Sequence, residues 1–295
     1  MTVTTTNNAG TGPAGAAGTW RLGDRTVNRL GFGTMRLPQD SGWRPRDREQ
    51  AVAVLRRAVE LGVNHLDTAA FYFSPSRSAN ELVNTALRGH YDELVIGTKV
   101  GPGRDPSGDW LPEARPEQLR GQVEENLRQL GRDHLDLVNL RIGAALERGT
   151  GSLADRFGVL AELREEGLIR HLGLSNVGPE HLAEAQAIAP VVCVQNQYAL
   201  GNRADDALVD LCAEQGIAFV PFFAIQSGTT DERVTALAET HGVSPAQILL
   251  AWSLHRGPHV LAIPGTGDPA HLEENVAAAG IRLSAQDMAT LNSIE

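Results

Sequence analysis

From residue 28 onward, short apolar runs alternate with longer amphipathic stretches, and this alternation limits the possible fold more than any other feature. Strands that alternate with helices pair in parallel, and eight such units close into a (β/α)8 barrel, also called a TIM barrel. An open doubly wound sheet is the alternative. The strand-like runs are 29–33, 64–67, 94–99, 135–140, 170–175, 191–195, 218–222 and 260–263. The helical patterns include 51–61, 117–130, 153–166, 180–188, 205–215 and 245–255.

The domain organisation follows from length and local composition. A chain of 295 residues is long enough for one such barrel, and no proline-rich linker divides it. Residues 1–18 are small and polar, which predicts a disordered N-terminal tail. Residues 19–27 predict a short β-hairpin that turns at Gly23 and Asp24. We therefore expect one barrel domain over residues 19–295.

Composition excludes several classes of function. A net charge of −10, without a basic stripe, argues against a nucleic-acid partner. Cys193 and Cys212 lack CxxC spacing, so neither a disulfide nor a metal site is expected. The tail has no signal-peptide pattern, and no run reaches the roughly 18 apolar residues of a membrane span. The sequence predicts a soluble cytoplasmic protein that acts on a small molecule, and it carries no signal for an oligomeric state.

Lys99 is the only lysine among the 26 lysine and arginine residues, and it ends the strand-like run 94–99. Burial and neighbouring charges can shift the pKa of an ammonium, whereas a guanidinium stays charged. Asp67 ends the preceding run, Tyr72 follows five residues later, and barrel active sites form at these strand ends. We expect Asp67 to keep Lys99 charged and Lys99 to lower the pKa of Tyr72, which could then act as a general acid. A strand-end salt bridge and an aromatic lid are the alternatives.

These residues belong to a longer set of motifs, namely 30–35 (LGFGTM), Asp67 to Tyr72, 97–99 (GTK), 173–176 (GLSN) and 263–266 (IPGT). By these motifs the chain resembles the aldo-keto reductase family from about residue 27 to residue 295. The stretches 107–112, 138–141 and 194–198 look most like its bacterial pyridoxal reductase (pyridoxine 4-dehydrogenase) subgroup. The resemblance implies an enzyme with NADPH, or less often NADH, bound across the barrel mouth. Its substrate would be an aldehyde or ketone, either pyridoxal or a biosynthetic carbonyl intermediate, reduced by hydride transfer.

The resemblance also implies residue roles. Tyr72 would be the proton donor, with Asp67 and Lys99 as its partners. Arg141 stands where most of the family has histidine, and it would donate a hydrogen bond to the substrate oxygen, although a strand-end salt bridge is the alternative. The implied cofactor contacts are Gly33 and Thr34 near the nicotinamide ribose, Ser175, Asn176 and Gln195 at the carboxamide, Phe222 stacked on the ring, and Gly265, Thr266, His271 and Asn275 farther along the cofactor.

One departure from the family concerns the choice between cofactors. The loop 265–271 lacks the arginine or lysine that commonly pairs with the 2′-phosphate of NADPH. His271 is the only cation near it in the sequence, and Asp268 would repel a phosphate. NADPH remains the expectation, with NADH open.

Two other functional classes fit parts of the pattern. A strand-end lysine in a barrel also suits a Schiff-base aldolase, in which Lys99 would attack a carbonyl. An NADP(H)-binding regulatory subunit with vestigial activity is the second alternative. The set Asp67, Tyr72 and Lys99 favours the reductase over both.

Overall fold

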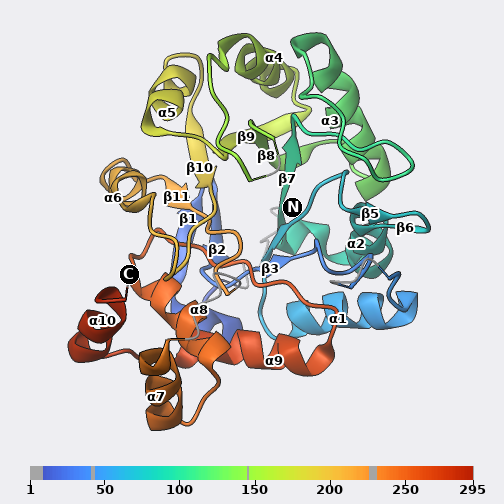
Figure 1. Ribbon diagram of the computed structural model, residues 1–295. Helices are drawn as coiled ribbons and strands as arrows, with labels where there is room; N and C mark the ends of the chain where they lie inside the picture. Colours follow the sequence, from blue (N-terminus) through green and yellow to red (C-terminus); the bar gives the residue numbers. More distant parts are fainter. Residues whose placement is uncertain (1–8, 41–43, 145, 226–230, 295) are drawn as a thin grey trace, which may run out of the picture.

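The computed structural model describes residues 9–40, 44–144, 146–225 and 231–294. Its central feature is a curled parallel sheet whose outer face is covered by helices (Figure 1). The strand order is β11-β10-β9-β8-β7-β4-β3, so strands that follow one another in the chain lie side by side. The strands are β3 (Phe32–Gly33), β4 (His65–Asp67), β7 (Val95–Val100), β8 (Leu135–Arg141), β9 (Ile169–Ser175), β10 (Val191–Gln195) and β11 (Ala218–Phe219).

The predicted eighth strand, 260–263, is present as isolated bridges that join the two ends of this sheet. Val260 bridges Phe219 of β11, and Ala262 bridges Leu30 just before β3, both in parallel. The backbone N–H of Leu261 donates to the carbonyl of Phe219 at 2.9 Å. The N–H of Gly31 donates to the carbonyl of Ala262 at 2.8 Å. The ring is therefore closed, as the (β/α)8 prediction requires, and the open-sheet alternative is wrong.

Ten α-helices surround the sheet in the described part of the chain. Six of them were expected, within a few residues at each end: α1 (Arg48–Glu60), α3 (Pro116–Leu130), α4 (Ala154–Glu165), α5 (Pro179–Gln186), α6 (Asp206–Glu214) and α8 (Pro245–His255). The patterns above did not predict α2 (Ala79–Leu87), α7 (Glu232–His241), α9 (Pro269–Ala277) and α10 (Ala285–Asn292). Two minor elements matter below, the short strands β5 (Phe73–Ser74) and β6 (Arg77–Ser78), which pair antiparallel.

The N-terminal prediction is partly wrong. Residues 1–8 lie outside the described residues, but Pro13–Ala17 forms the 3-10 helix η1, with Ala14 fully buried. The backbone N–H of Ala14 donates to the carbonyl of Leu61 at the end of α1, which anchors this segment to the barrel. The polar composition of the tail concealed this small apolar contact.

The predicted hairpin is confirmed, as β1 (Thr19–Leu22) pairs with β2 (Arg25–Asn28) around Gly23 and Asp24. Its apolar side chains Leu22 and Val27 join a buried cluster with barrel residues that include Val95 and Leu137. The hairpin therefore fills the end of the barrel where the strands begin.

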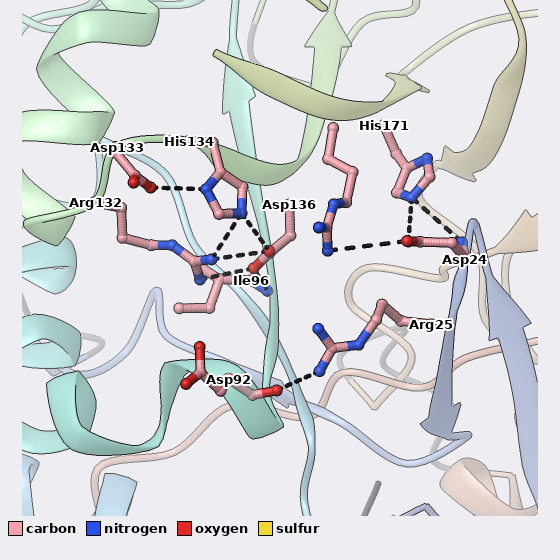
Figure 2. A network of polar contacts seen from close by, with 10 residues as sticks. Asp24, Arg25, Asp92, Ile96, Arg132, Asp133, His134, Asp136 and His171 are labelled. Atoms are coloured by element: carbon pink, nitrogen blue, oxygen red, sulfur yellow. Dashed lines mark hydrogen bonds and ion pairs between the residues drawn. The ribbon is translucent and has the colours of Figure 1, made fainter. Parts of the chain in front are cut away.

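Polar contacts hold this end of the molecule together (Figure 2). His171 Nε2 lies 2.6 Å from the Asp24 carboxylate, which ties the hairpin turn to β9. Nearby, Arg132 pairs with Asp136 at 2.8 Å, and both side chains are less than a tenth exposed. Asp136 also accepts a hydrogen bond from the N–H of Ile96. These contacts are structural, and the opposite, C-terminal ends of the strands are left open.

Within the described residues, no helix is both long and apolar enough to cross a membrane.

Candidate active site

The C-terminal ends of β4 and β7 bring Asp67 and Lys99 into a buried ion pair. Lys99 Nζ lies 2.7 Å from each carboxylate oxygen of Asp67 and donates to the carbonyl of Thr68 at 3.1 Å. The side chains of Lys99 and Asp67 are only 3% and 9% exposed. The amide of Gln195, at the end of β10, donates to the same carboxylate at 2.7 Å. Two donor groups, the ammonium of Lys99 and the amide of Gln195, therefore converge on one buried carboxylate.

Tyr72 is held above this pair by a tight turn. Its N–H donates to the carbonyl of Ala69 at 3.0 Å, and its own carbonyl accepts from Ala79 at the start of α2, at 2.8 Å. The hairpin β5–β6 follows directly and fixes the loop. The Lys99 ammonium lies 4.9 Å from the centroid of the Tyr72 ring. The structure thus brings together the three residues that the sequence singled out.

The net pKa shift of the tyrosine is opposite to the expected one, although Lys99 acts in the predicted direction. Burial raises the pKa of Tyr72, and the attraction of Lys99 and Arg141 does not offset it. The Asp67 carboxylate contributes in the same direction as burial. For Lys99, burial works to lower the pKa, but Asp67 and Tyr72 together outweigh it and the pKa is raised. Lys99 is therefore a stable cation, and Tyr72 is a neutral hydroxyl at neutral pH.

Arg141, at the end of β8, adds a second cation to this edge. Its guanidinium lies 5.0 Å from the centroid of the Phe222 ring and donates to the hydroxyl of Ser175 at 3.1 Å. Burial lowers the pKa of Arg141, but a guanidinium remains charged at neutral pH. Tyr72 and Asp67 both act electrostatically on Arg141, which places it in the same cluster.

A buried hydrogen-bond network that the sequence analysis missed supports these strand ends. Thr34 donates to Thr68 at 2.9 Å, and Thr68 donates to Asn80 at 2.7 Å. Asn80 and Thr98 both donate to the amide oxygen of Asn126, at 2.9 and 2.6 Å. The network links the residues next to Asp67 and Lys99 to α2 and α3. Its members are common polar residues within helices and strands, so spacing gave no signal.

A cavity of about 850 Å³ opens above the cluster. Ten of the residues expected in the site line it: Gly33, Asp67, Tyr72, Lys99, Arg141, Phe222, Gly265, Thr266, His271 and Asn275. Four others do not, namely Thr34, Ser175, Asn176 and Gln195, and all four are buried.

Those four residues lie one layer below the cavity. Thr34 belongs to the buried network, and Ser175 accepts from Arg141 while keeping its own hydroxyl hydrogen to donate. Asn176 has φ 63° and donates to the carbonyl of Ile142 at 2.9 Å, so its amide N–H is used within the protein. For Asn176 the observed role is to hold the loop after β8. Its predicted cofactor contact stays a prediction.

The residues at the cavity floor and directly below it fit a dinucleotide with a carboxamide. In the described structure the buried Oε1 of Gln195 has no hydrogen-bond partner, and an unsatisfied buried acceptor is costly unless a ligand N–H completes it. A Cβ on Gly265 would lie 2.3 Å from the carbonyl oxygen of Gly33. Only glycine allows this close approach, which keeps side chains out of the floor.

The loop 265–271 has more positive charge beside it than its sequence indicated. His271 is not the only basic side chain nearby, because Arg46 lies against Gly267 and Arg36 lines the cavity. Asp268 caps α9 and accepts from the N–H of Ala270 at 2.8 Å. The fold brings Arg46 here from the segment before α1, so distance along the sequence concealed it.

The outer wall of the cavity is apolar. Trp110, Leu111 and Leu146 line it and are 55%, 50% and 51% exposed. Trp110 makes an edge contact with Phe71, their ring centroids 5.7 Å apart, and Phe71 in turn contacts Tyr72. Exposed apolar side chains gathered at one cavity mark a binding surface for an apolar or aromatic group.

No group of three or more His, Cys, Asp or Glu side chains in the described ranges could hold a metal ion. The cluster therefore offers proton donation and positive charge: one neutral hydroxyl beside two cations, at the floor of an apolar cavity.

Comparison with known proteins agrees with this arrangement. The model of the Aldo/keto reductase family matches residues 29–295. Pyridoxine 4-dehydrogenase of Escherichia coli is 45% identical over 284 residues, which cover 95% of this chain and 99% of that protein. A crystal structure of an aldo-keto reductase from Klebsiella pneumoniae in complex with NADPH has a TM-score of 0.77 and 29% identity, covering 92% of this chain and 93% of that one. The thermostable aldo-keto reductase Tm1743, in complex with the inhibitor epalrestat, has a TM-score of 0.79 and 28% identity, covering 94% and 99%.

Proposed function

The chain belongs to the aldo/keto reductase family and is an NAD(P)H-dependent oxidoreductase, and from this premise we propose that it reduces pyridoxal to the corresponding alcohol with NADPH. The observation that carries the proposal is the buried Lys99–Asp67 pair beneath Tyr72, at the floor of a cavity with aromatic walls. The similarity to pyridoxine 4-dehydrogenase of E. coli supports the substrate, and the NADPH complex of the Klebsiella enzyme supports the cofactor.

In this mechanism, Tyr72 gives its hydroxyl proton to the carbonyl oxygen as the carbon is reduced. Bound NADPH would supply the hydride. Burial keeps Tyr72 protonated beforehand, so the acid is ready at neutral pH. Lys99 and Arg141 then stabilise the tyrosinate that remains, because both cations face it in a desolvated site. Asp67 keeps Lys99 charged and fixed, and solvent returns the proton to Tyr72 after product leaves.

The side chains below the cavity would orient the cofactor. Ser175 and Gln195 each retain a group that could bond a carboxamide, namely a hydroxyl hydrogen and an unpaired Oε1. Gly33, Gly265 and Phe222 line the cavity where a flat ring would rest. These roles are part of the proposal.

The two other functional classes have less support. Lys99 donates hydrogen bonds to three oxygen atoms, and its pKa is raised, so it is not the neutral amine that a Schiff-base aldolase needs. The comparisons give the regulatory-subunit alternative no support.

The test is a panel of aldehydes assayed by loss of NADPH absorbance, with pyridoxal, benzaldehyde and propanal as substrates. We expect the highest kcat/KM for pyridoxal. Trp110→Ala should lower kcat/KM for the two aromatic aldehydes about tenfold and leave propanal within about twofold, since it removes about 1–2 kcal/mol of aromatic contact. Ile188→Ala is the matched control, because Ile188 is 40% exposed but does not line the cavity. If pyridoxal is reduced no faster than propanal, the substrate assignment is wrong.

A further inference from the structure

The segment before α1 places a cation against the glycine of the loop that leads into α9. An ideal Cβ on Gly267 would lie 2.4 Å from Cδ of Arg46 and 2.5 Å from its Nε. Nε of Arg46 donates to the carbonyl of Arg36 at 2.8 Å. The amide of Gln50, in the first turn of α1, donates to the carbonyl of Gly267 at 2.8 Å. One hydrogen bond therefore fixes the Arg46 side chain on Arg36, and the other ties the start of α1 to this loop.

The guanidinium of Arg46 interacts electrostatically with Asp268, but among the described residues no group forms a hydrogen bond with its terminal nitrogens. Within the described ranges, Nη1 and Nη2 of Arg46 make no hydrogen bond or ion pair, although the side chain is half-buried. Asp268 is the adjacent acid, but its carboxylate accepts from the N–H groups of Ala270 and His271 at the start of α9. A half-buried guanidinium fixed through Nε, with both terminal nitrogens free, is suited to bidentate binding of a phosphate.

Two further basic side chains lie near this loop, and the two acids beside them, Asp268 and Glu274, both accept hydrogen bonds within the protein. His271 lines the cavity on the other side of the loop, and Arg36 lines it next to the β3 end. The cavity residue Thr266 belongs to this loop, and the cavity residue Asn275 lies in α9. An anionic group that enters this end of the cavity meets the basic side chains of His271 and Arg36 and the acid Glu274, and Arg46 lies just outside the lining, against Gly267.

We infer that Arg46 binds the 2′-phosphate of NADPH and sets the preference for NADPH over NADH. Arg46 thereby takes the place of the cation that loop 265–271 lacks, and Gly267 is glycine because any side chain there would displace it. The inference rests on the proposed use of NADPH, but it concerns binding alone. Its test therefore requires no substrate.

The test measures dissociation constants by isothermal titration calorimetry, with NADPH, NADH, 2′,5′-ADP and 5′-AMP as probes. Arg46→Ala should weaken NADPH and 2′,5′-ADP on the order of tenfold to a hundredfold, the usual range for lost charge-assisted hydrogen bonds. NADH and 5′-AMP should change by less than about twofold. Arg44→Ala is the matched control, because Arg44 is two residues away, has an 83% exposed side chain and pairs with Asp40.

Gly267→Ala supplies a second, independent variant. Gly267 does not have a positive φ, so alanine is allowed by the backbone and acts by pushing Arg46 away. It should weaken NADPH as Arg46→Ala does, and the double variant should be no weaker than either single one, because both remove the same contact.

Several results would overturn the inference. Equal weakening of NADPH and NADH in Arg46→Ala would make Arg46 a structural support of the loop. Loss of the preference in His271→Ala or Arg36→Ala, with Arg46→Ala unchanged, would move the phosphate contact to those residues. A wild-type protein that binds both cofactors equally would show that no residue distinguishes the 2′-phosphate. Failure to reduce pyridoxal, by contrast, would count against the proposed substrate alone.

Discussion

Replacing Lys99 with methionine isolates the energy of the buried ion pair. The variant keeps a straight apolar stem but removes three hydrogen bonds and leaves the 9% exposed Asp67 carboxylate with only the amide of Gln195. Removing one member of a buried pair typically costs about 3–5 kcal/mol, because a desolvated charge remains without a partner. That is a large part of the roughly 5–15 kcal/mol by which folded domains are stable.

Urea unfolding at neutral pH, followed by circular dichroism, measures the effect of Lys99→Met. The double variant Asp67→Asn/Lys99→Met should recover most of the loss, since it removes both charges. Arg57→Met is the control, because Arg57 pairs with Glu273 at the surface, where the side chains are 44% and 57% exposed and such pairs contribute about 0–1 kcal/mol. A loss for Lys99→Met no larger than for Arg57→Met would refute the reasoning that the pair is desolvated.

Three further predictions concern charge at or near the barrel end. Lys99→Arg should lower kcat on the order of a hundredfold, as is typical of misplaced catalytic groups, because the planar guanidinium does not fit the compact site of the ammonium. Turnover at the wild-type rate would contradict this prediction. Arg141→Ala should lower kcat by about 10²–10³ and change the dissociation constant of NADPH much less, whereas an unchanged kcat would make Arg141 structural. Burial lowers the pKa of His65 from 6.5 to about 4, so only the unfolded chain binds this proton between those pH values. The unfolding free energy should therefore fall by up to about 3 kcal/mol between pH 6.5 and 4, and His65→Gln should lack this part of the pH dependence.

The barrel could be predicted because its signal is periodic. Apolar runs alternate with amphipathic ones regardless of which side chains make contact, and the pattern gave the strand order and six helices. The run 260–263 marked the eighth strand, although only isolated bridges form there. The helix α2 was hidden because it begins directly after the short β5–β6 hairpin, in a region that resembled a loop.

The site was predictable only where residues sit at strand ends. Asp67, Lys99 and Arg141 were identifiable because the C-terminal ends of parallel strands meet at one edge in every barrel of this fold. The direction of the pKa shift of Tyr72 was not predictable, because it depends on burial outweighing the attraction of Lys99. Arg46 was missed for a related reason, since only the fold brings it beside Gly267.

The central claim is that Tyr72 donates the proton during reduction, and single-turnover oxidation of bound NADPH by pyridoxal in Tyr72→Phe tests it most directly. We expect the rate to fall by about 10²–10⁴ while the dissociation constant of NADPH stays unchanged. In the wild type the rate should stay level through neutral pH and fall only in the alkaline range, because burial raises the pKa of Tyr72 and keeps it protonated. A phenylalanine variant that reduces pyridoxal at the wild-type rate would contradict the mechanism.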